Sequence, residues 1–292
     1  VDYTDVIKDA KDTFLSGNEE LARTLFDKIP ENSPFYKLAC TELAVMDFIA
    51  GDKKKGIELS HKALKIDNDD VFALCNLSTM YFDDGDMENS KFYYEKVKKV
   101  ATDDPDDLYK ITMCACEQKE HDVVLSFAEK IQAHRPYDVN LIFIRAVALY
   151  NLGKIGASRD LMYEALSLRG RDTVLEYYVK IIDSAIEMGR EGVKNDMKYF
   201  FQLPAPEIEV QRNILKKMID YSPAQIDKSL KDKETMIAID WAINYGDTES
   251  QKFAVYILAT SKFKWAEKML LDMLINSNLT DYLKKLILTV LV

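Results

Sequence analysis

Glycines recur at a fixed spacing along the first half of this 292-residue chain. Gly17, Gly51 and Gly85 lie 34 residues apart, and Gly153 lies twice that distance beyond Gly85. The position missing from the series is occupied by Lys119. A period of about 34 residues predicts stacked structural units, each of which buries its apolar face against its neighbours.

At two further positions of the repeat, small or medium-sized side chains recur with the same period; each such set of equivalent residues is called a column. Seven residues before the glycine positions stand Ala10, Ala44, Ser78, Thr112 and Ala146, and five residues after them stand Ala22, Gly56, Ser90, Val124 and Ser158. Glycine readily ends a helix because it takes positive φ, and small side chains let two helices cross closely. The pattern therefore predicts five units of two antiparallel helices over residues 3–170.

The composition favours an all-α fold. Proline and glycine are sparse, at 7 and 10 residues, while 48% hydrophobic and 30% charged residues exclude a disordered or membrane-embedded chain. No apolar run approaches the roughly 20 residues that a membrane-spanning helix needs, so membrane insertion is not expected. The four cysteines are too few for a disulfide framework and indicate a reducing environment, so we expect a cytoplasmic protein.

The net charge of −10 falls almost entirely on residues 1–170. An acidic surface repels phosphate groups, so nucleic-acid binding is not expected. The acidic runs at 67–70, 83–86 and 103–107 lie near predicted helix ends, where carboxylates cap backbone N–H groups. They do not form a calcium loop, because a loop with Gly85 at its sixth position would need Met80 as its first ligand.

Beyond Gly170 the 34-residue register is lost, but helical periodicity continues. The predicted helices span 174–188, 193–202, 207–221, 233–245, 249–260, 263–275 and 280–292, with a further helix that begins at Ser222-Pro223. Helices of this length suggest irregular or HEAT-like pairs, with a change of direction at 203–206. The predicted domains are a repeat array over 1–170 and a helical extension over 171–292 that continues the solenoid.

Both ends of the sequence are unusual. It begins with Val1 and ends in the apolar stretch Leu286–Val292. Because soluble proteins seldom end in an exposed apolar strip, we expect either a piece of a longer protein or an end that docks on another surface.

The repeated units resemble the tetratricopeptide repeat, a family of 34-residue helix–turn–helix units. The resemblance rests on the small residue at the eighth position, Gly-Asp at 51–52 and 85–86, Tyr81 at the eleventh position, the closing segment 63–68, and Pro136. The tryptophan expected near the start of each unit is absent. The family implies a right-handed α-α superhelix, in which the first helix of each pair lines an inner groove that binds peptides or partner helices.

Carried onto this sequence, the resemblance predicts an apolar and aromatic groove. Its residues would be Val45, Phe72, Cys75, Thr79, Tyr109, Met113, Phe143, Val147 and Tyr150. Chaperone-binding members hold a terminal carboxylate with polar side chains, whereas the corresponding positions here are Thr41, Val45, Cys75 and Thr79. An apolar groove suits an amphipathic helix or a hydrophobic peptide as the partner. Alternatively, the same side chains pack against later helices of the chain itself.

The sequence contains no recognisable catalytic or cofactor motif. Cys114 and Cys116 point about 200° apart on a helix and cannot share a metal ion, so neither a metal nor a cofactor is predicted. The function predicted is a non-catalytic scaffold for protein–protein interaction. Two alternatives are a regulatory sensor of a peptide or effector, and the interaction module of a larger protein whose catalytic domain lies outside this sequence.

Overall fold

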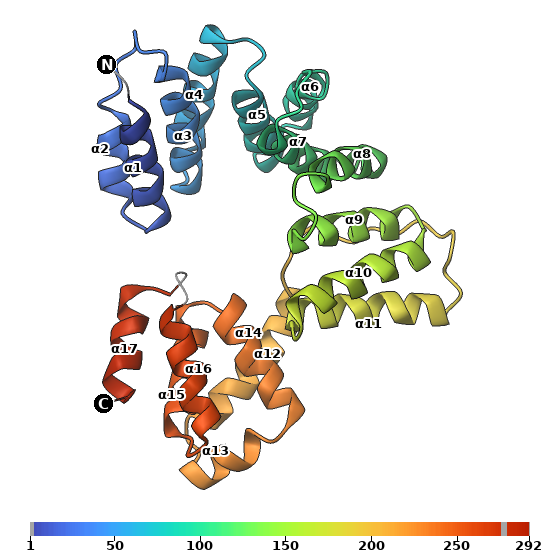
Figure 1. Cartoon of the computed structure of the whole chain (residues 1–292). Coiled ribbons are helices and arrows are strands. Elements are labelled where there is room, and N and C mark those ends of the chain that lie inside the picture. Colours follow the sequence, from blue (N-terminus) through green and yellow to red (C-terminus); the bar gives the residue numbers. More distant parts are fainter. Residues whose placement is uncertain (1–2, 276–278, 292) are drawn as a thin grey trace. The chain divides into compact units, whose positions relative to one another are not determined.

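The computed structural model describes residues 3–275 and 279–291, and all regular secondary structure in these residues is α-helical (Figure 1). The all-α prediction is thereby confirmed. The chain divides into two compact units, unit 1 at Val1–Leu152 and unit 2 at Gly153–Val292. This division falls inside the fifth predicted repeat, between its two helices. The domain boundary at residue 170 was predicted from the loss of the 34-residue period, and it stays a prediction.

Unit 1 consists of consecutive helix pairs. Its helices are α1 (Thr4–Leu15), α2 (Glu19–Phe26), α3 (Tyr36–Ile49), α4 (Lys53–Ile66), α5 (Val71–Asp83), α6 (Met87–Val97), α7 (Pro105–Glu117), α8 (His121–Gln132) and α9 (Val139–Asn151). Helices α1 and α2, α3 and α4, α5 and α6, and α7 and α8 pack as pairs, and the second helix of each pair contacts the first helix of the next. The first helices α3, α5 and α7 also contact one another in sequence order.

Gly17, Gly51 and Gly85 form the turns between paired helices, as predicted, and Gly153 follows α9 with the same sign of φ. Gly17, Gly51, Gly85 and Gly153 have φ of 89°, 88°, 78° and 81°. Lys119 occupies the missing position and takes φ of 58°, the one positive φ at a non-glycine residue in the described part of the chain. The turn is therefore kept without glycine, although a side chain disfavours this conformation by roughly 1 kcal/mol.

The columns of small residues are buried. Ala10, Ala44, Ser78, Thr112 and Ala146, together with Ala22, Ser90, Val124 and Ser158, are all 0% exposed. At Gly56 an added Cβ would lie 2.9 Å from the carbonyl oxygen of Ala44. Larger side chains at these positions would force the helices apart.

The acidic runs provide helix N-caps, as predicted. Side chains of Asp70, Asp86 and Asp104 accept hydrogen bonds from backbone N–H groups in the first turns of α5, α6 and α7. Asp52 and Asp138 do the same for α4 and α9. These carboxylates satisfy N–H groups that a helix start otherwise leaves unpaired, and they lie at the positive end of the helix dipole.

Unit 2 contains less regular helices. They are α10 (Ile155–Arg169), α11 (Thr173–Glu187), α12 (Ala205–Met218), α13 (Pro223–Ser229), α14 (Lys233–Tyr245), α15 (Thr248–Thr260), α16 (Lys264–Ile275) and α17 (Asp281–Leu291). Helix α14 contacts α11, α12 and α15, and α17 contacts α15 and α16. Most of the predicted helices are confirmed to within a few residues; the last residue of the final one, Val292, lies outside the described residues.

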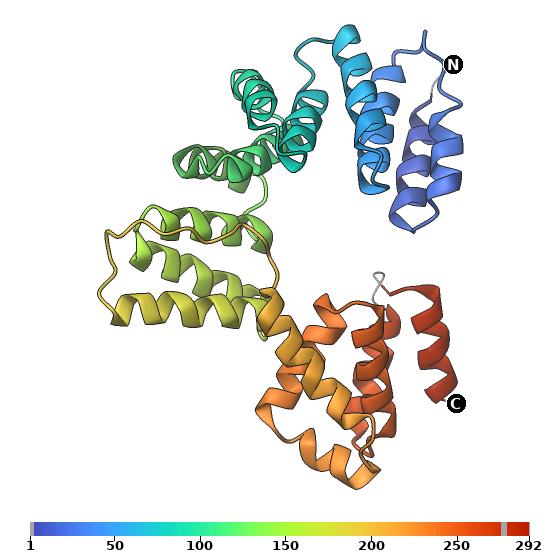
Figure 2. The same ribbon diagram turned by 180° about the vertical axis from the view of Figure 1, so that it is seen from behind.

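The predicted helix over 193–202 is wrong. The stretch between α11 and α12 contains no helix (Figures 1 and 2). Gly189 and Gly192 both take positive φ, at 65° and 80°, which breaks helical geometry at its start. The Tyr178 hydroxyl then donates to the carbonyl oxygens of Phe200 and Gln202, at 3.1 and 3.2 Å, and holds this backbone against α11.

Candidate protein-binding surface

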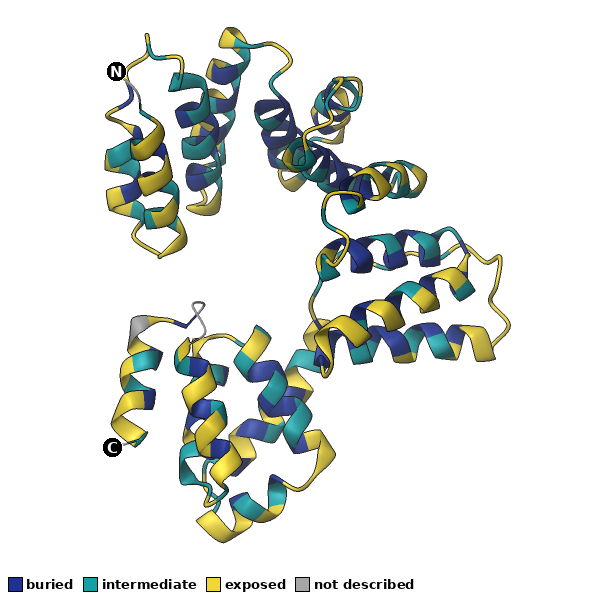
Figure 3. Cartoon of the chain, viewed as in Figure 1, coloured by how far each residue is buried: buried dark blue, intermediate teal, exposed yellow. Residues whose placement is uncertain are grey.

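The nine predicted groove residues differ in burial. Val45 on α3, Phe72 and Thr79 on α5, and Tyr109 and Met113 on α7 are half-buried; these five are called the first-helix row below. Cys75 and Tyr150 are 5% and 6% exposed, while Phe143 and Val147 are 0% exposed. Much of α5 and α9 is buried accordingly (Figure 3). The four buried side chains present almost no surface to a partner. The side chains of the first-helix row still have solvent-exposed surface that a partner could bury.

A lysine lies over the aromatic ring at the start of the row. Lys110 Nζ of α7 is 4.4 Å from the centroid of the Phe72 ring of α5. A cation held over a ring face is worth about 0.5–1 kcal/mol at exposed sites. This contact ties α5 to α7 and places a positive charge beside an otherwise apolar stretch.

A carboxyl group joins the same two helices at the other end of α7. The Thr79 hydroxyl lies 3.1 Å from both carboxyl oxygens of Glu117. Burial raises the pKa of Glu117 from its usual 4.5 to about 7; the hydrogen bond from Thr79 opposes this shift, and the nearby Asp83 carboxylate adds to it. Glu117 therefore changes its charge near neutral pH.

Replacing Glu117 by glutamine should remove a pH dependence of stability. The folded state holds the Glu117 proton more tightly than the unfolded chain, so this group's contribution is complete below about pH 4.5 and is lost as the pH rises to about 7. We expect Glu117→Gln to equal the wild type near pH 5 and to exceed it by about 2 kcal/mol at pH 8. Denaturant unfolding at both pH values measures this difference.

The exposed Glu58 of α4 supplies a matched control, since Glu58→Gln removes a carboxylate that makes no ion pair within the described residues. Parallel pH profiles for the wild type and Glu117→Gln would show that the Glu117 carboxyl is not held neutral in the folded state.

The cysteines near the row are buried and weakly reactive. The Cys114 thiol donates to the carbonyl oxygen of Cys75 at 3.8 Å. Burial raises the pKa of the Cys75 and Cys116 thiols, which keeps them protonated, and a thiol is a poor nucleophile and metal ligand. In residues 3–275 and 279–291 no group of three or more His, Cys, Asp or Glu side chains could hold a metal ion.

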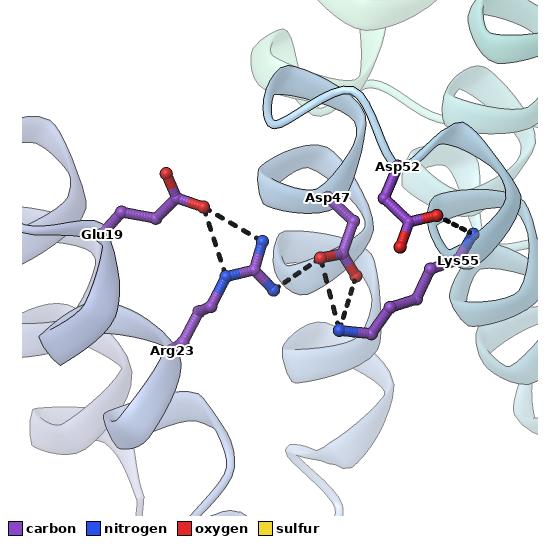
Figure 4. A network of polar contacts seen from close by, with 5 residues as sticks. All are labelled: Glu19, Arg23, Asp47, Asp52 and Lys55. Carbon is purple, nitrogen blue, oxygen red and sulfur yellow. Dashed lines mark hydrogen bonds and ion pairs between the residues drawn. The ribbon is translucent and has the colours of Figure 1, made fainter.

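A buried carboxylate links the first two helix pairs (Figure 4). Asp47 of α3 is 3% exposed, and its Oδ1 lies 2.6 Å from Nη1 of Arg23 on α2. Lys55 Nζ of α4 lies 3.4 Å from both oxygens of Asp47, and Arg23 also pairs with Glu19 at 3.1 Å. Because one charge is shared by three helices, this network fixes how α2, α3 and α4 pack and has a structural role.

Lys110 and Glu117 were not predicted as parts of the surface. A signal for Glu117 is present in the sequence, because Tyr109, Met113 and Glu117 are spaced by four residues and so lie on one helical face. The signal for Lys110 is absent, since its position over Phe72 depends on how α5 and α7 pack.

Comparison with known proteins agrees with this architecture. Paired helices, left-handed turns and small residues at the crossings define a helical-repeat protein. A family model described as the tetratricopeptide repeat matches residues 73–104, which cover most of α5, all of α6 and the connection towards α7. Residues 73–104 therefore match one tetratricopeptide repeat, and the helix pairs before it keep the same period and the same positive-φ glycine turns.

Solved structures of similar fold include a tetratricopeptide repeat protein from Parabacteroides merdae, which is 15% identical with a TM-score of 0.47 over 99% of this chain and 98% of its own. They also include MamA AMB-1, at 20% identity and a TM-score of 0.43 over 53% of this chain and 90% of its own, and MamA MSR-1, at 18% and 0.44 over 54% and 89%. A search of curated proteins found no match.

None of the described helices combines the length and the apolarity needed to cross a bilayer.

Proposed function

We propose that the chain is a non-catalytic scaffold that binds a polypeptide partner along the first-helix row. The observation that carries this proposal is the placement of half-buried apolar and aromatic side chains on neighbouring first helices, with Phe72 on α5 and Tyr109 and Met113 on α7. Such side chains can still bury surface, and aromatic residues dominate the energy of many interfaces.

The partner that fits this surface presents apolar side chains, as an amphipathic helix or an apolar peptide does. The row is apolar apart from Thr79, whose hydroxyl already faces the Glu117 carboxyl. The helices that carry it are held by the packing of neighbouring pairs, so the entropy cost of ordering falls mainly on the partner. The four cysteines are free and buried, which agrees with a cytoplasmic location.

A peptide selection tests this proposal. Peptides displayed on phage are selected on the whole chain, and an enriched peptide is then titrated by fluorescence anisotropy. Replacing Phe72 and Met113 together by alanine should weaken binding roughly tenfold or more, because the peptide loses two apolar contacts. Circular dichroism of the variant confirms that its helices remain folded.

The control is Phe92→Ala, which removes an aromatic side chain that is 53% exposed on the second helix α6. This variant should bind the selected peptide as the wild type does. Unchanged binding by the Phe72 and Met113 variant, or loss of binding by Phe92→Ala, would overturn the assignment of the surface.

A further inference from the structure

A carboxyl group beside the first-helix row has no cation to balance it. Glu117 is half-buried and stands four residues after Met113, on the face of α7 that also carries Tyr109. Its two oxygens share one donor, the Thr79 hydroxyl of α5, at 3.1 Å. Among the described residues no lysine, arginine or histidine forms an ion pair with Glu117. When ionised, this carboxylate therefore depends on a single hydroxyl and on the water that still reaches it.

The charged groups near Glu117 do not compensate its charge. Asp83 of α5 disfavours the ionised form, and the cation that pairs with Asp83 at 2.6 Å is Lys53 of α4. The thiols of Cys75 on α5 and Cys116 on α7 are neutral, because burial raises their pKa. The turn after α7 and the neighbouring helices α6 and α8 carry further charged or titratable groups, none of which contributes to the pKa shift of Glu117: Glu95, Lys98, Lys119, Glu120, His121 and Asp122.

The cation beside the row, Lys110, lies too far along α7 to pair with Glu117. It stands seven residues earlier, which corresponds to about 10 Å of helix rise, and its Nζ is held over the Phe72 ring at 4.4 Å. An ion pair needs the two charged groups within about 4 Å of each other. The row thus has a positive charge near its start and a carboxyl group without a cation near its end.

A partner that covers the row also removes water from Glu117. The Thr79 hydroxyl belongs to the row and contacts this carboxyl directly, so a polypeptide seated over Thr79 and Met113 reaches it. Desolvation without a cation disfavours the ionised carboxylate strongly and the neutral acid much less. Burial already raises the pKa of Glu117 to about 7, against the hydrogen bond from Thr79, so the neutral acid is populated near pH 7 before any partner binds.

We propose that binding of an apolar polypeptide at the first-helix row is coupled to the uptake of a proton by Glu117. The complex holds the proton at pH values where much of the free chain has lost it, so a falling pH strengthens binding and a rising pH weakens it. This inference rests on the proposed function, because it concerns the same surface and the same class of partner. It adds a regulation by pH to that surface.

The pH dependence of peptide binding tests this coupling. Displayed peptides are selected on the whole chain at pH 6, and the peptide taken forward is capped at both ends and carries no titratable side chain. Its affinity is measured by fluorescence anisotropy at pH 6, 7 and 8, with a label that does not titrate in this range. We expect about tenfold weaker binding at pH 8 than at pH 6, the full effect of one group with a pKa of about 7 in the free chain that stays protonated in the complex.

Glu117→Gln replaces the titrating carboxyl by a neutral amide of the same shape. This variant should bind the peptide equally at all three pH values, with the affinity that the wild type has at pH 6. Glu58→Gln, an exposed substitution on α4, is the matched control and should keep the pH dependence of the wild type. Calorimetric titration in two buffers of different ionisation enthalpy measures the proton directly: the wild type should take up roughly half a proton at pH 7 and about one at pH 8, and Glu117→Gln none.

Each negative outcome points to a different error. Equal binding by the wild type at pH 6 and pH 8, tighter binding at pH 8, or a pH dependence that persists in Glu117→Gln would overturn the coupling and would leave the first-helix row as the binding surface. Enrichment only of peptides that carry a lysine or an arginine would also overturn it, since a partner cation would then compensate the carboxylate. A selection that enriches no peptide would overturn the proposed function, and the coupling with it.

Discussion

Phe143→Ala should destabilise unit 1 by about 3–5 kcal/mol, the usual cost of truncating a fully buried phenylalanine. Phe143 lies on α9 and is 0% exposed, so alanine removes apolar contacts and leaves a cavity. Phe143→Leu keeps most of the volume and should cost only about 1 kcal/mol. Unit 1 contains no tryptophan, so far-ultraviolet circular dichroism during denaturant unfolding is the appropriate measurement.

The matched control is Tyr137→Ala, just before α9, where an aromatic side chain is 76% exposed. This change should alter stability by less than about 0.5 kcal/mol. If Phe143→Ala instead unfolded like the wild type and only lost the peptide selected on the first-helix row, Phe143 would belong to a binding surface and its burial in α9 would be contradicted.

Gly153→Ala should destabilise unit 2 by about 3 kcal/mol, through two separate effects. Gly153 has φ of 81°, which alone costs a residue with a side chain about 1–2 kcal/mol. An added Cβ would also lie 2.8 Å from the carbonyl carbon of Gly192 and 2.9 Å from the carbonyl oxygen of Val193. These are backbone atoms, held by a 2.8 Å hydrogen bond from Gly192 N–H to the carbonyl oxygen of Gly153, so they cannot move aside cheaply.

Gly189→Ala separates the two effects. Gly189 lies in the same unit and has φ of 65°, but an added Cβ there meets nothing within 4 Å. We expect a loss of only about 1 kcal/mol for this variant. Trp241 and Trp265, the only tryptophans of the chain, both lie in unit 2 and report its unfolding by fluorescence. Equal losses of stability for the two variants would show that a Cβ at position 153 does not clash with the backbone of Gly192 and Val193.

Much of unit 1 could be predicted because its determinants are local. The positive φ at Gly51 and Gly85 and the close crossing at Gly56 follow from residue type and spacing alone. At Lys119 residue type does not predict the turn. The surrounding repeat imposes a positive φ that the lysine side chain disfavours.

What could not be predicted depends on contacts between distant segments. The stretch over 193–202 has a helical pattern, but its backbone is held by the hydroxyl of Tyr178, which lies more than 20 residues earlier. The periodic pattern places Phe143 on a helical face and cannot tell whether that face is covered. A pocket lined by residues of α11, α12 and α14 exists only because these three helices converge, which no local pattern shows.

The aspartates that begin the helices connect the charge of the chain to its architecture. Asp52, Asp70, Asp86, Asp104 and Asp138 each give a carboxylate to the first turn of a helix in unit 1. Negative charge thus accumulates with every added repeat, and it cannot be removed without uncapping helices. We therefore expect an array built this way to disfavour polyanionic partners, as a by-product of how its helices start.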